Sequence, residues 1–432
     1  MREAAEIVRS RVLLAGVDTG EENDFERSME ELKNLAEAAG KEVAGVITQR
    51  LAAVNKSLCM GRGKTAEAKE FAEICQAQEV IFDNALTPSQ VRNLSRELSL
   101  PVSDRTDLIL EIFAIRAQTR EAKLQVETAR LQYMLPKLVG MHEALGRQGG
   151  ASGSMSNKGA GEKKLELDRR KIEHRITELK KELDKIAKTR RTQRKRRGVS
   201  SIPQVALVGY TNAGKSTILN RMVEKYGESP QKTVLEKDML FATLETNVRT
   251  IDTGDARPFF LADTVGFIHK LPHGLIKAFR STLEEVKYAD LLVIVVDFSD
   301  ENYKRQMEVT FETLKELEAG DISQIIVYNK ADKCNLEKLP RVNGTQIYIS
   351  AREGIGIAEL VDLIKNTVYT DNQEYAFLVP YDRGEAISYL LDHSVVLELE
   401  YREAGVWLKA RCSRRDAGVY QMYAVQREDA EN

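Results

Sequence analysis

The stretch GYTNAGKST, residues 209–217, constrains the fold of this 432-residue chain more than any other feature. It fits the pattern G-x-x-x-x-G-K-[ST], in which a glycine-rich turn between a strand and a helix surrounds phosphate groups with backbone N–H groups. The apolar run QVALVG precedes it, and the helix-like run TILNRMVEKYG follows it. An ordinary glycine turn would give the same local pattern, so motifs elsewhere in the chain decide the interpretation.

Four further motifs follow the glycine-rich turn in a fixed order. FATLET occupies 241–246, and LADTVGF at 261–267 ends the strand-like run RPFFLAD. NKAD at 329–332 follows QIIVY, and SAREG at 350–354 follows QIYI. Because strand-like and helix-like runs alternate over 202–368, these motifs predict a P-loop nucleotide-binding domain with a parallel α/β fold.

The chemistry of these motifs predicts a role for each group around the phosphates. We expect Lys215 to reach the β- and γ-phosphates and Ser216 to ligate Mg²⁺. Asp263 would hold the magnesium shell, the Gly266 N–H would meet the γ-phosphate, and Thr243 would close over the ion. Lys215, Thr243 and Gly266 are therefore the predicted catalytic residues, and Ser216, Thr243 and Asp263 the predicted metal ligands.

The NKAD motif predicts guanine as the base. Asp332 can accept hydrogen bonds from guanine N1–H and its 2-amino group, whereas adenine offers neither donor. A buried carboxylate left unpaired in this way discriminates between bases by roughly 10⁴-fold or more. The predicted cofactors are GTP or GDP with Mg²⁺, and the Ala351 N–H would approach the guanine carbonyl. The predicted contact residues are Gly209, Tyr210, Thr211, Asn212, Ala213, Gly214, Lys215, Ser216, Thr217, Phe241, Ala242, Thr243, Asp263, Thr264, Val265, Gly266, Asn329, Lys330, Asp332, Ser350, Ala351 and Arg352.

Hydrolysis needs a group that positions the attacking water. Ras-like proteins use a glutamine directly after the glycine of the D-x-x-G motif. This chain has Phe267 at that position, which cannot hydrogen-bond a water molecule. The sequence therefore predicts slow intrinsic turnover that rises when a partner binds.

Residues 1–105 predict a smaller α/β domain. RVLLAGV, EVAGVIT and EVIFDN read as strands, and three helix-like runs alternate with them. The last of these helices has Thr87 as its N-cap and Pro88 in its first turn. Regular alternation of this kind predicts a parallel sheet.

A long helical hairpin is predicted over 106–198. Both flanks carry apolar residues at helical spacing, and the intervening GRQGGASGSMSNKGAGE, residues 146–162, is too rich in glycine and serine to be a regular element. We therefore expect two antiparallel helices joined by a flexible tip loop. A simple linker between domains is the alternative.

The second flank is strongly basic although the whole chain carries a formal net charge of −2. Residues 169–197 contain 14 Lys or Arg and four Asp or Glu. This concentration suits a polyphosphate partner, because neutralising phosphates releases counterions. The stretch has no aromatic residues, so folded RNA read through its backbone fits better than splayed single-stranded bases. A merely solvated helix face is the alternative.

The remaining borders follow from composition. We expect a GTPase domain over 199–370 and a small α+β domain over 371–432, where two strands flank an Ala-Gly turn.

The four cysteines are scattered, and the early apolar run is too short for a signal peptide or a membrane span. These features favour the cytosol and no membrane requirement. We also expect a monomer in solution.

The motifs GYTNAGKST, LFATLET and DTVGFIHKLPHGLIKAF resemble those of the HflX-type GTPases. So do GRGK at 61–64, VIFDNALTPSQVRNL at 80–94, DRTDLILEIFAIRAQTREAKLQVE at 104–127 and GEKKLELDRR at 161–170. The resemblance extends to about residue 370. It implies a cytosolic GTPase that binds the large ribosomal subunit through its helical hairpin and splits or rescues stalled ribosomes.

The predicted hairpin tip departs from the family pattern. The family usually has G-G-x-G-x-R-G-P-G-E, whereas this chain has the longer GGASGSMSNKGAGE at 149–162. Contacts of the family's tip therefore do not carry over as a set. The candidate RNA-contact residues are Lys158, Gly159, Gly161, Arg169, Arg170, Arg190 and Arg191.

Two other functions remain open from the sequence. The chain could be a GTP-dependent signalling or scaffold switch whose partner is a protein, with the basic helix only solvated. The resemblance also implies ATP-dependent remodelling of ribosomal RNA through the N-terminal domain. GRGK is too short for a phosphate-binding loop of the Walker type, so only the family resemblance supports this last alternative.

Overall fold

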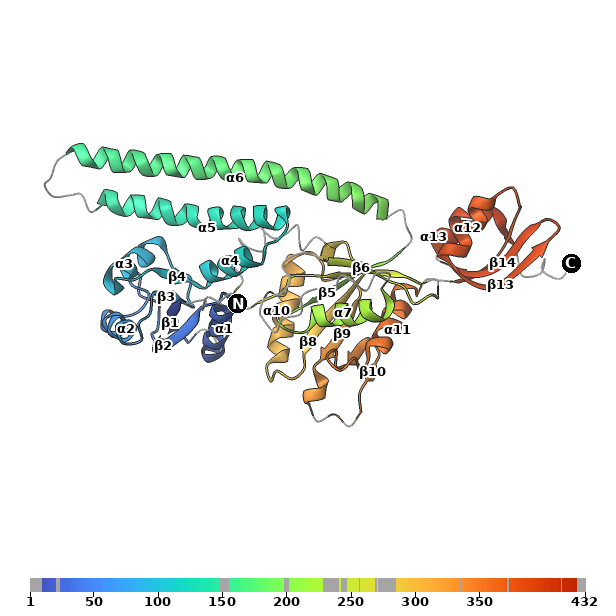
Figure 1. Cartoon of the computed structure of the whole chain (residues 1–432), viewed down its shortest axis with the longest axis horizontal. Coiled ribbons are helices and arrows are strands. Elements are labelled where there is room, and N and C mark those ends of the chain that lie inside the picture. Colours follow the sequence, from blue (N-terminus) through green and yellow to red (C-terminus); the bar gives the residue numbers. More distant parts are fainter. Residues whose placement is uncertain are drawn as a thin grey trace, which may run out of the picture. The chain divides into compact units, whose positions relative to one another are not determined.

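The computed structural model has two compact units, shown in Figure 1. The N-terminal unit comprises Met1–Lys188 together with Asp238–Leu244 and His269–Arg280. The second unit comprises Thr189–Lys237, Glu245–Ile268 and Ser281–Asn432. The structure describes residues 10–20, 24–147, 155–197, 202–227, 241, 247–255, 257–268, 270, 285–334, 336, 338–370, 373–412 and 414–425.

The N-terminal unit is built on a four-stranded parallel sheet in the order β2-β1-β3-β4. The strands are β1 (Arg11–Asp18), β2 (Glu42–Arg50), β3 (Glu79–Phe82) and β4 (Val102–Asp104), and the connecting helices are α1 (Phe25–Ala38), α2 (Arg62–Ile74) and α3 (Pro88–Leu98). Val12, Leu13 and Leu14 of β1 are fully buried, because helices cover both faces of the strand. The predicted parallel α/β fold is confirmed.

The helix cap predicted at Thr87 is present. Its hydroxyl accepts a hydrogen bond from the Gln90 N–H at 3.3 Å, and Gln90 Oε1 accepts one from the Thr87 N–H at 2.9 Å. This reciprocal pair is a capping box, and Pro88 stands at the start of the helix. The strand β4 is absent from the prediction, because three residues are too few to show a period.

The segment predicted as helical from 106 to 147 consists of two helices. They are α4 (Arg105–Arg116) and α5 (Arg120–Arg147). Asp104 caps α4 by accepting bonds from the N–H groups of Thr106 and Asp107 at 3.0 and 3.1 Å. Thr119 starts α5, since its hydroxyl accepts a bond from the Ala122 N–H at 3.2 Å. The cap at Thr119 starts a new helix despite the continuous apolar pattern.

The hairpin is antiparallel, as predicted (Figure 1). Helix α6 (Met155–Arg197) runs beside α5, and two ion pairs join them. Arg120 lies 2.8 Å from Glu182, and Arg175 lies 2.9 Å from Glu127. Residue numbers rise along one helix as they fall along the other, which defines the antiparallel direction. Leu179 of α6 is fully buried in the seam.

Part of the range expected as a tip loop is helical. Helix α6 begins at Met155, so residues 155–162 form its first turns despite Gly159 and Gly161. Extending an existing long helix costs less than starting a new one, so local glycines need not end it. The prediction that no regular element forms over 146–162 is wrong for this part.

The second unit contains a seven-stranded sheet in the order β10-β11-β9-β8-β5-β7-β6. Its strands are β5 (Gln204–Gly209), β6 (Asn247–Ile251), β7 (Phe259–Asp263), β8 (Leu291–Asp297), β9 (Gln324–Asn329), β10 (Arg341–Asn343) and β11 (Gln346–Tyr348), and its helices are α7 (Lys215–Tyr226), α10 (Tyr303–Glu316), η1 (Ala331–Lys333) and α11 (Ile357–Val368). Strands β7, β5, β8, β9 and β11 are parallel, so their carboxyl ends share one edge. The predicted P-loop domain fold is confirmed.

The C-terminal part of this unit forms a separate antiparallel sheet in the order β13-β14-β12-β15. Its elements are β12 (Gln373–Val379), α12 (Gly384–His393), β13 (Val395–Arg402), β14 (Gly405–Cys412), α13 (Arg414–Val419), η2 (Gln421–Tyr423) and β15 (Ala424–Val425). The two strands predicted around the Ala-Gly turn are β13 and β14. Strand β12 and the short β15 were not predicted.

Candidate nucleotide-binding site

The glycine-rich loop joins β5 to α7, as the sequence predicts. Gly209 has φ 144°, and a Cβ there would lie 2.2 Å from the Val295 carbonyl oxygen. Gly214 has φ 96°, and a Cβ there would lie 2.2 Å from the Asn329 amide nitrogen. Both positions require glycine for conformation and for space. The loop can therefore approach a ligand with its backbone N–H groups.

Lys215 begins α7 and is almost fully buried. Its Nζ donates to the carbonyl oxygens of Gly209 and Tyr210 at 3.0 and 2.7 Å. Burial lowers the pKa of Lys215 to about 8, although the nearby Asp263 carboxylate opposes the shift. A buried ammonium of this kind gains from an anionic phosphate, because the phosphate supplies the countercharge that water no longer provides.

The residues predicted to hold Mg²⁺ include a suitable oxygen pair. The Ser216 hydroxyl donates to Asp263 Oδ2 at 2.7 Å, and Asp263 is fully buried at the end of β7. A hydroxyl and a carboxylate at one point suit Mg²⁺, which prefers oxygen ligands. The donor set therefore fits the ion. The third predicted ligand, Thr243, and its neighbour Ala242 lie outside the described residues.

The segment after Asp263 is bonded to the glycine-rich loop. Phe267 N–H donates to the Gly209 carbonyl at 3.1 Å, and its own carbonyl accepts from Thr211 N–H at 2.8 Å. A Cβ on Gly266 would lie 2.8 Å from Thr211 and 3.0 Å from Lys215 Nζ. Gly266 therefore packs closely against the lysine that is expected to hold the phosphates. The Phe267 side chain is buried and offers no polar group to water.

Asn329 joins the loops that surround the site. Its Nδ2 donates to the Ala213 carbonyl at 2.9 Å, and its Oδ1 accepts from the Ala351 N–H at 3.0 Å. Lys330 Nζ lies 2.7 Å from Asp297 Oδ2 at the end of β8. The Asp332 carboxylate belongs to an exposed residue in η1, where a base can reach it.

The sequence analysis missed two residues that support these loops. Arg221 of α7 donates to the Ala351 and Arg352 carbonyls at 3.2 and 2.7 Å, which fixes the SAREG loop. Asp297 is the partner of Lys330. Both residues lie outside the recognised motifs, although Asp297 ends a strand at the same sheet edge as the motif residues.

Two predicted contact residues use their side chains elsewhere. The Thr264 hydroxyl donates to the Leu207 carbonyl at 2.6 Å and is fully buried. Phe241 is buried against Phe113 of α4, with ring centroids 4.7 Å apart and an interplanar angle of 80°. Of the other predicted contacts, Tyr210, Asn212, Ser216 and Thr217 lie in or directly after the glycine-rich loop, while Val265 and Ser350 are buried.

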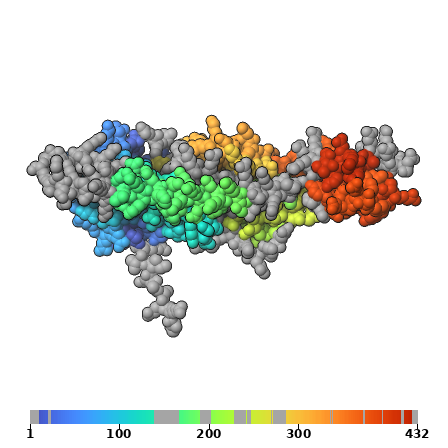
Figure 2. All heavy atoms as spheres, turned by 90° about the horizontal axis from the view of Figure 1, so that it is seen from above, coloured from blue at the N-terminus to red at the C-terminus, as the bar shows by residue number. Residues whose placement is uncertain are grey.

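Most side chains between residues 166 and 189 of the basic helix α6 are exposed or half-buried, and Figure 2 shows this part of the helix in green. Arg169 and Arg170 are exposed and pair with Glu173 and Glu166 of the same helix at 2.9 and 3.0 Å. Lys158, Gly159, Gly161, Arg190 and Arg191 lie within the helix, and their side chains are outside the described set. Among the helices that the structure describes, none is both long and apolar enough to cross a bilayer.

Comparison with known proteins covers the chain almost end to end. Residues 26–114, 116–197 and 204–330 match the families described as GTP-binding GTPase N-terminal, GTP-binding GTPase Middle Region and 50S ribosome-binding GTPase. The chain is 42% identical over 95% of its length to a GTPase HflX of Caldanaerobacter subterraneus, covering 92% of that protein. It is 38% identical to the Escherichia coli GTPase HflX, with 84% of each chain covered.

Among solved structures, one similar chain is a GTP-binding protein of Sulfolobus solfataricus in complex with GDP. It is 25% identical, with 83% of this chain and 99% of that chain covered, at a TM-score of 0.43.

Proposed function

Because this chain belongs to the GTPase HflX family, which binds and hydrolyses GTP, we propose that it uses GTP to act on ribosomes. It would bind the large ribosomal subunit and its RNA and split or rescue stalled ribosomes. The match of residues 204–330 to the family described as 50S ribosome-binding GTPase supports this partner.

The observation that carries the proposal is the charge of α6. Residues 188–197 read KTRRTQRKRR and contain no acidic residue, in a chain whose formal net charge is −2. Several basic residues nearer the middle of α6 pair with glutamates, as Arg169 and Arg175 do. A run with so concentrated a positive charge suits the phosphates of folded RNA, because neutralising phosphates releases counterions.

At the nucleotide site, Lys215 would bind the β- and γ-phosphates, and Ser216, Thr243 and Asp263 would hold Mg²⁺. The ion would neutralise charge on the phosphates when bound. The Gly266 N–H would meet the γ-phosphate, while Asp332 and Ala351 would select guanine. Because Phe267 cannot orient a water molecule, the ribosome would supply or order the missing group.

We propose domain borders at 105/106, 198/199 and 370/371, a cytoplasmic location and a monomer in solution. The candidate RNA contacts are those of the hairpin: Lys158, Gly159, Gly161, Arg169, Arg170, Arg190 and Arg191.

Co-sedimentation with large ribosomal subunits tests the partner. The full chain with a non-hydrolysable GTP analogue should pellet with the subunits at low salt and dissociate steeply as salt rises. Replacing Arg194, Arg196 and Arg197 by Gln should weaken binding strongly. The matched control replaces three exposed basic residues of α10, Lys304, Arg305 and Lys315, by Gln and should bind as the parent does.

Absence of the chain from the pellet at low salt would overturn the proposal and favour a switch with a protein partner. Equal binding by both triple variants would overturn the role of the basic helix. Preference for ATP over GTP at the site after Gly209 would contradict the nucleotide assignment.

A further inference from the structure

The loop that carries the SAREG motif is closed at its two ends. Ser350 and Ile355 exchange two backbone hydrogen bonds, at 3.1 Å from the Ser350 N–H and at 3.0 Å from the Ile355 N–H. Gly354 has φ 73°, in the left-handed region that favours glycine. These contacts fix where the loop leaves the sheet and where it returns. Residues 351–353 form the middle of the loop.

Arg221 of α7 holds this middle part. Its Nε donates to the Ala351 carbonyl at 3.2 Å, and its Nη2 donates to the Arg352 carbonyl at 2.7 Å. A guanidinium presents its donors in a rigid planar fork, so the two bonds fix two successive carbonyl groups relative to one another. In a trans peptide the N–H points away from the C=O of the same group. The bonds therefore also fix the directions of the N–H groups of Arg352 and Glu353.

Ala351 is held through both of its backbone polar groups. Its N–H donates to Asn329 Oδ1 at 3.0 Å, its carbonyl accepts from Arg221, and the residue is fully buried. Asn329 belongs to the NKAD motif, whereas Arg221 lies outside the recognised motifs. The position of the residue expected to meet the guanine carbonyl thus depends on one motif side chain and on one side chain outside the motifs.

Helix α7 gives Arg221 a rigid support. Leu219 and Met222 are fully buried in the core of the nucleotide-binding domain, so the helix cannot shift without disturbing close packing. The same helix begins at Lys215, six residues before Arg221. This separation corresponds to about 9 Å along the helix axis. One element therefore carries the lysine expected to bind the phosphates and the arginine that holds the loop expected to bind the base.

The ion pair of Arg221 with Glu224 is separate from the contacts to the loop. Glu224 Oε2 lies 3.0 Å from Arg221 Nη1, and both side chains are partly exposed. The loop is bonded to the other two guanidinium nitrogens, Nε and Nη2. An exposed pair of this kind contributes little to stability. A substitution at Glu224 can therefore remove the pair and keep the bonds to the loop.

We propose that Arg221 is a positioning residue for guanine recognition, acting through the peptide groups on either side of Arg352. This inference rests on the proposed assignment of Ala351 to the guanine carbonyl. Arg221 holds the loop in the arrangement that meets this carbonyl, whereas Asp332 would bind N1–H and the 2-amino group from η1. Loss of Arg221 therefore weakens recognition of the guanine O6 and leaves recognition of the 2-amino group unchanged.

Three nucleotides separate these two contributions. GDP carries O6 and the 2-amino group, 6-thio-GDP replaces O6 by sulfur, a weaker hydrogen-bond acceptor, and inosine diphosphate lacks the 2-amino group. Dissociation constants are measured at neutral pH with the purified full chain and without ribosomes.

Arg221→Gln should weaken GDP binding by about threefold to tenfold and should reduce the preference for GDP over 6-thio-GDP by a similar factor. The preference for GDP over inosine diphosphate should stay at the parent value, which a general loss of structure at the site would not produce. Arg221→Lys keeps the charge and loses the planar fork, so it should lie between the parent and Arg221→Gln.

Two variants serve as matched controls. Arg305→Gln removes an arginine of α10 that pairs with Glu308 at 2.8 Å, three residues further on, in the same spacing as the pair of Arg221 and Glu224. Glu224→Gln removes the ion pair of Arg221 and keeps its bonds to the loop. Both variants should bind the three nucleotides as the parent does. A loss in either control equal to that in Arg221→Gln would overturn the proposal, because exposed charge and not the loop contacts would then decide affinity.

Hydrogen exchange in the nucleotide-free chain tests the contact without a ligand. The N–H groups of Glu353 and Gly354 are bonded to Ser350 Oγ and to the Ala351 carbonyl. In Arg221→Gln they should exchange faster than in the parent, while the amides of β5 keep their protection. Unchanged exchange in the loop, or an equal loss of protection in β5, would contradict a local positioning role.

The nucleotide measurements distinguish this inference from the assignment on which it rests. A parent that binds GDP and 6-thio-GDP equally would overturn the assignment of Ala351 to the guanine carbonyl, and the role of Arg221 with it. A parent that prefers GDP, with the same preference in folded Arg221→Gln, would overturn the role of Arg221 alone.

Discussion

The charge of Lys215 depends on whether a phosphate is bound beside it. In the structure this lysine is buried, its Nζ donates to two carbonyl oxygens, and its pKa is lowered to about 8. A bound phosphate favours the protonated form and raises this pKa. Above pH 8 the free protein must take up a proton to bind, so affinity falls as pH rises through about 8.

The first prediction is therefore a loss of GTP affinity between pH 7 and pH 8.5, by up to about fourfold, accompanied by proton uptake. Calorimetric titration in buffers of different ionisation enthalpy measures both quantities. Affinity that is constant over this range, with no proton uptake at pH 8.5, would show that Lys215 is already charged in the free protein.

Asn329 shows how one amide can support two loops at once. Replacing it by Ala leaves the buried Ala213 carbonyl and Ala351 N–H without their partner, at about 1–3 kcal/mol each. We expect GDP and GTP affinities to fall alike, by roughly 30-fold or more. Asn343→Ala, an exposed asparagine on β10, is the control and should bind as the parent does. Loss of affinity for GTP alone would contradict this supporting role.

At the scale of the element, the stability of the hairpin depends on apolar side chains buried between its two helices, although the outer face of the hairpin is strongly charged. Leu179 of α6 is fully buried, whereas Leu167 of the same helix is 56% exposed. Leu179→Ala should destabilise the packing of α5 and α6 by about 2–5 kcal/mol, and Leu167→Ala should change it little. Hydrogen exchange measures the effect: protection should fall in α5 and α6 and persist in β5 and β8. Equal effects of both variants would argue against this seam.

The helices also show where prediction from apolar periodicity misplaces the ends of elements. The apolar period over 106–147 continues smoothly, yet the structure divides it at 117–119. Thr119 marks the division, because its hydroxyl accepts a hydrogen bond from a free N–H group in the first turn of α5. Such caps can be recognised in a sequence. Whether a cap ends one helix and starts another inside a continuous apolar pattern depends on how each helix packs in the folded protein.

At the scale of the whole molecule, the chain combines a nucleotide site without a water-positioning glutamine and a basic helical arm. If the ribosome supplies the missing catalytic group, turnover with saturating large subunits should exceed intrinsic turnover on the order of 10²-fold or more. Single-turnover assays with and without subunits measure this ratio. The triple Gln variant of Arg194, Arg196 and Arg197 should lose the stimulation and keep the intrinsic rate. Rapid hydrolysis by the chain alone would contradict the prediction.

The sequence by itself determined the nucleotide site, because its chemistry lies in short motifs at the ends of strands. A parallel sheet brings Gly209, Asp263 and Asn329 to one edge whatever the intervening loops contain. Local sequence patterns, strand–helix alternation and apolar residues at helical spacing, likewise predicted the N-terminal α/β fold and the antiparallel hairpin. The roles of individual side chains at the site stay predictions.

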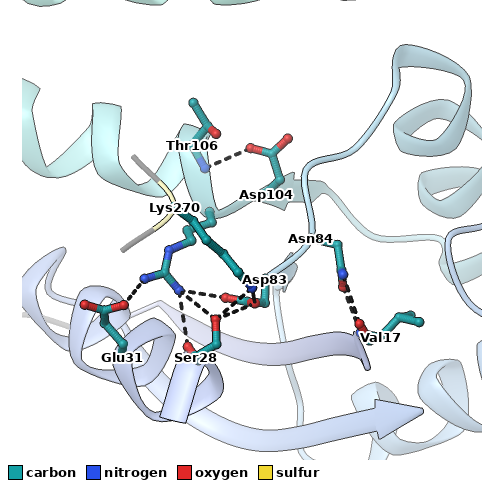
Figure 3. A network of polar contacts seen from close by, with 9 residues as sticks. Val17, Ser28, Glu31, Asp83, Asn84, Asp104, Thr106 and Lys270 are labelled. Carbon is teal, nitrogen blue, oxygen red and sulfur yellow. Dashed lines mark hydrogen bonds and ion pairs between the residues drawn. The ribbon is translucent and has the colours of Figure 1, made fainter. Parts of the chain in front are cut away.

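Only the tertiary structure decided which remote side chains meet Asp83 and Phe113. Lys270 Nζ lies 2.6 Å from Asp83 Oδ2 although 187 residues separate the two in the sequence (Figure 3), and Phe241 is similarly remote from Phe113. Neither pair has a spacing or period that a sequence pattern could show. Their proximity follows from how the chain returns to the N-terminal unit twice, and a buried charge or ring finds its partner only after that return.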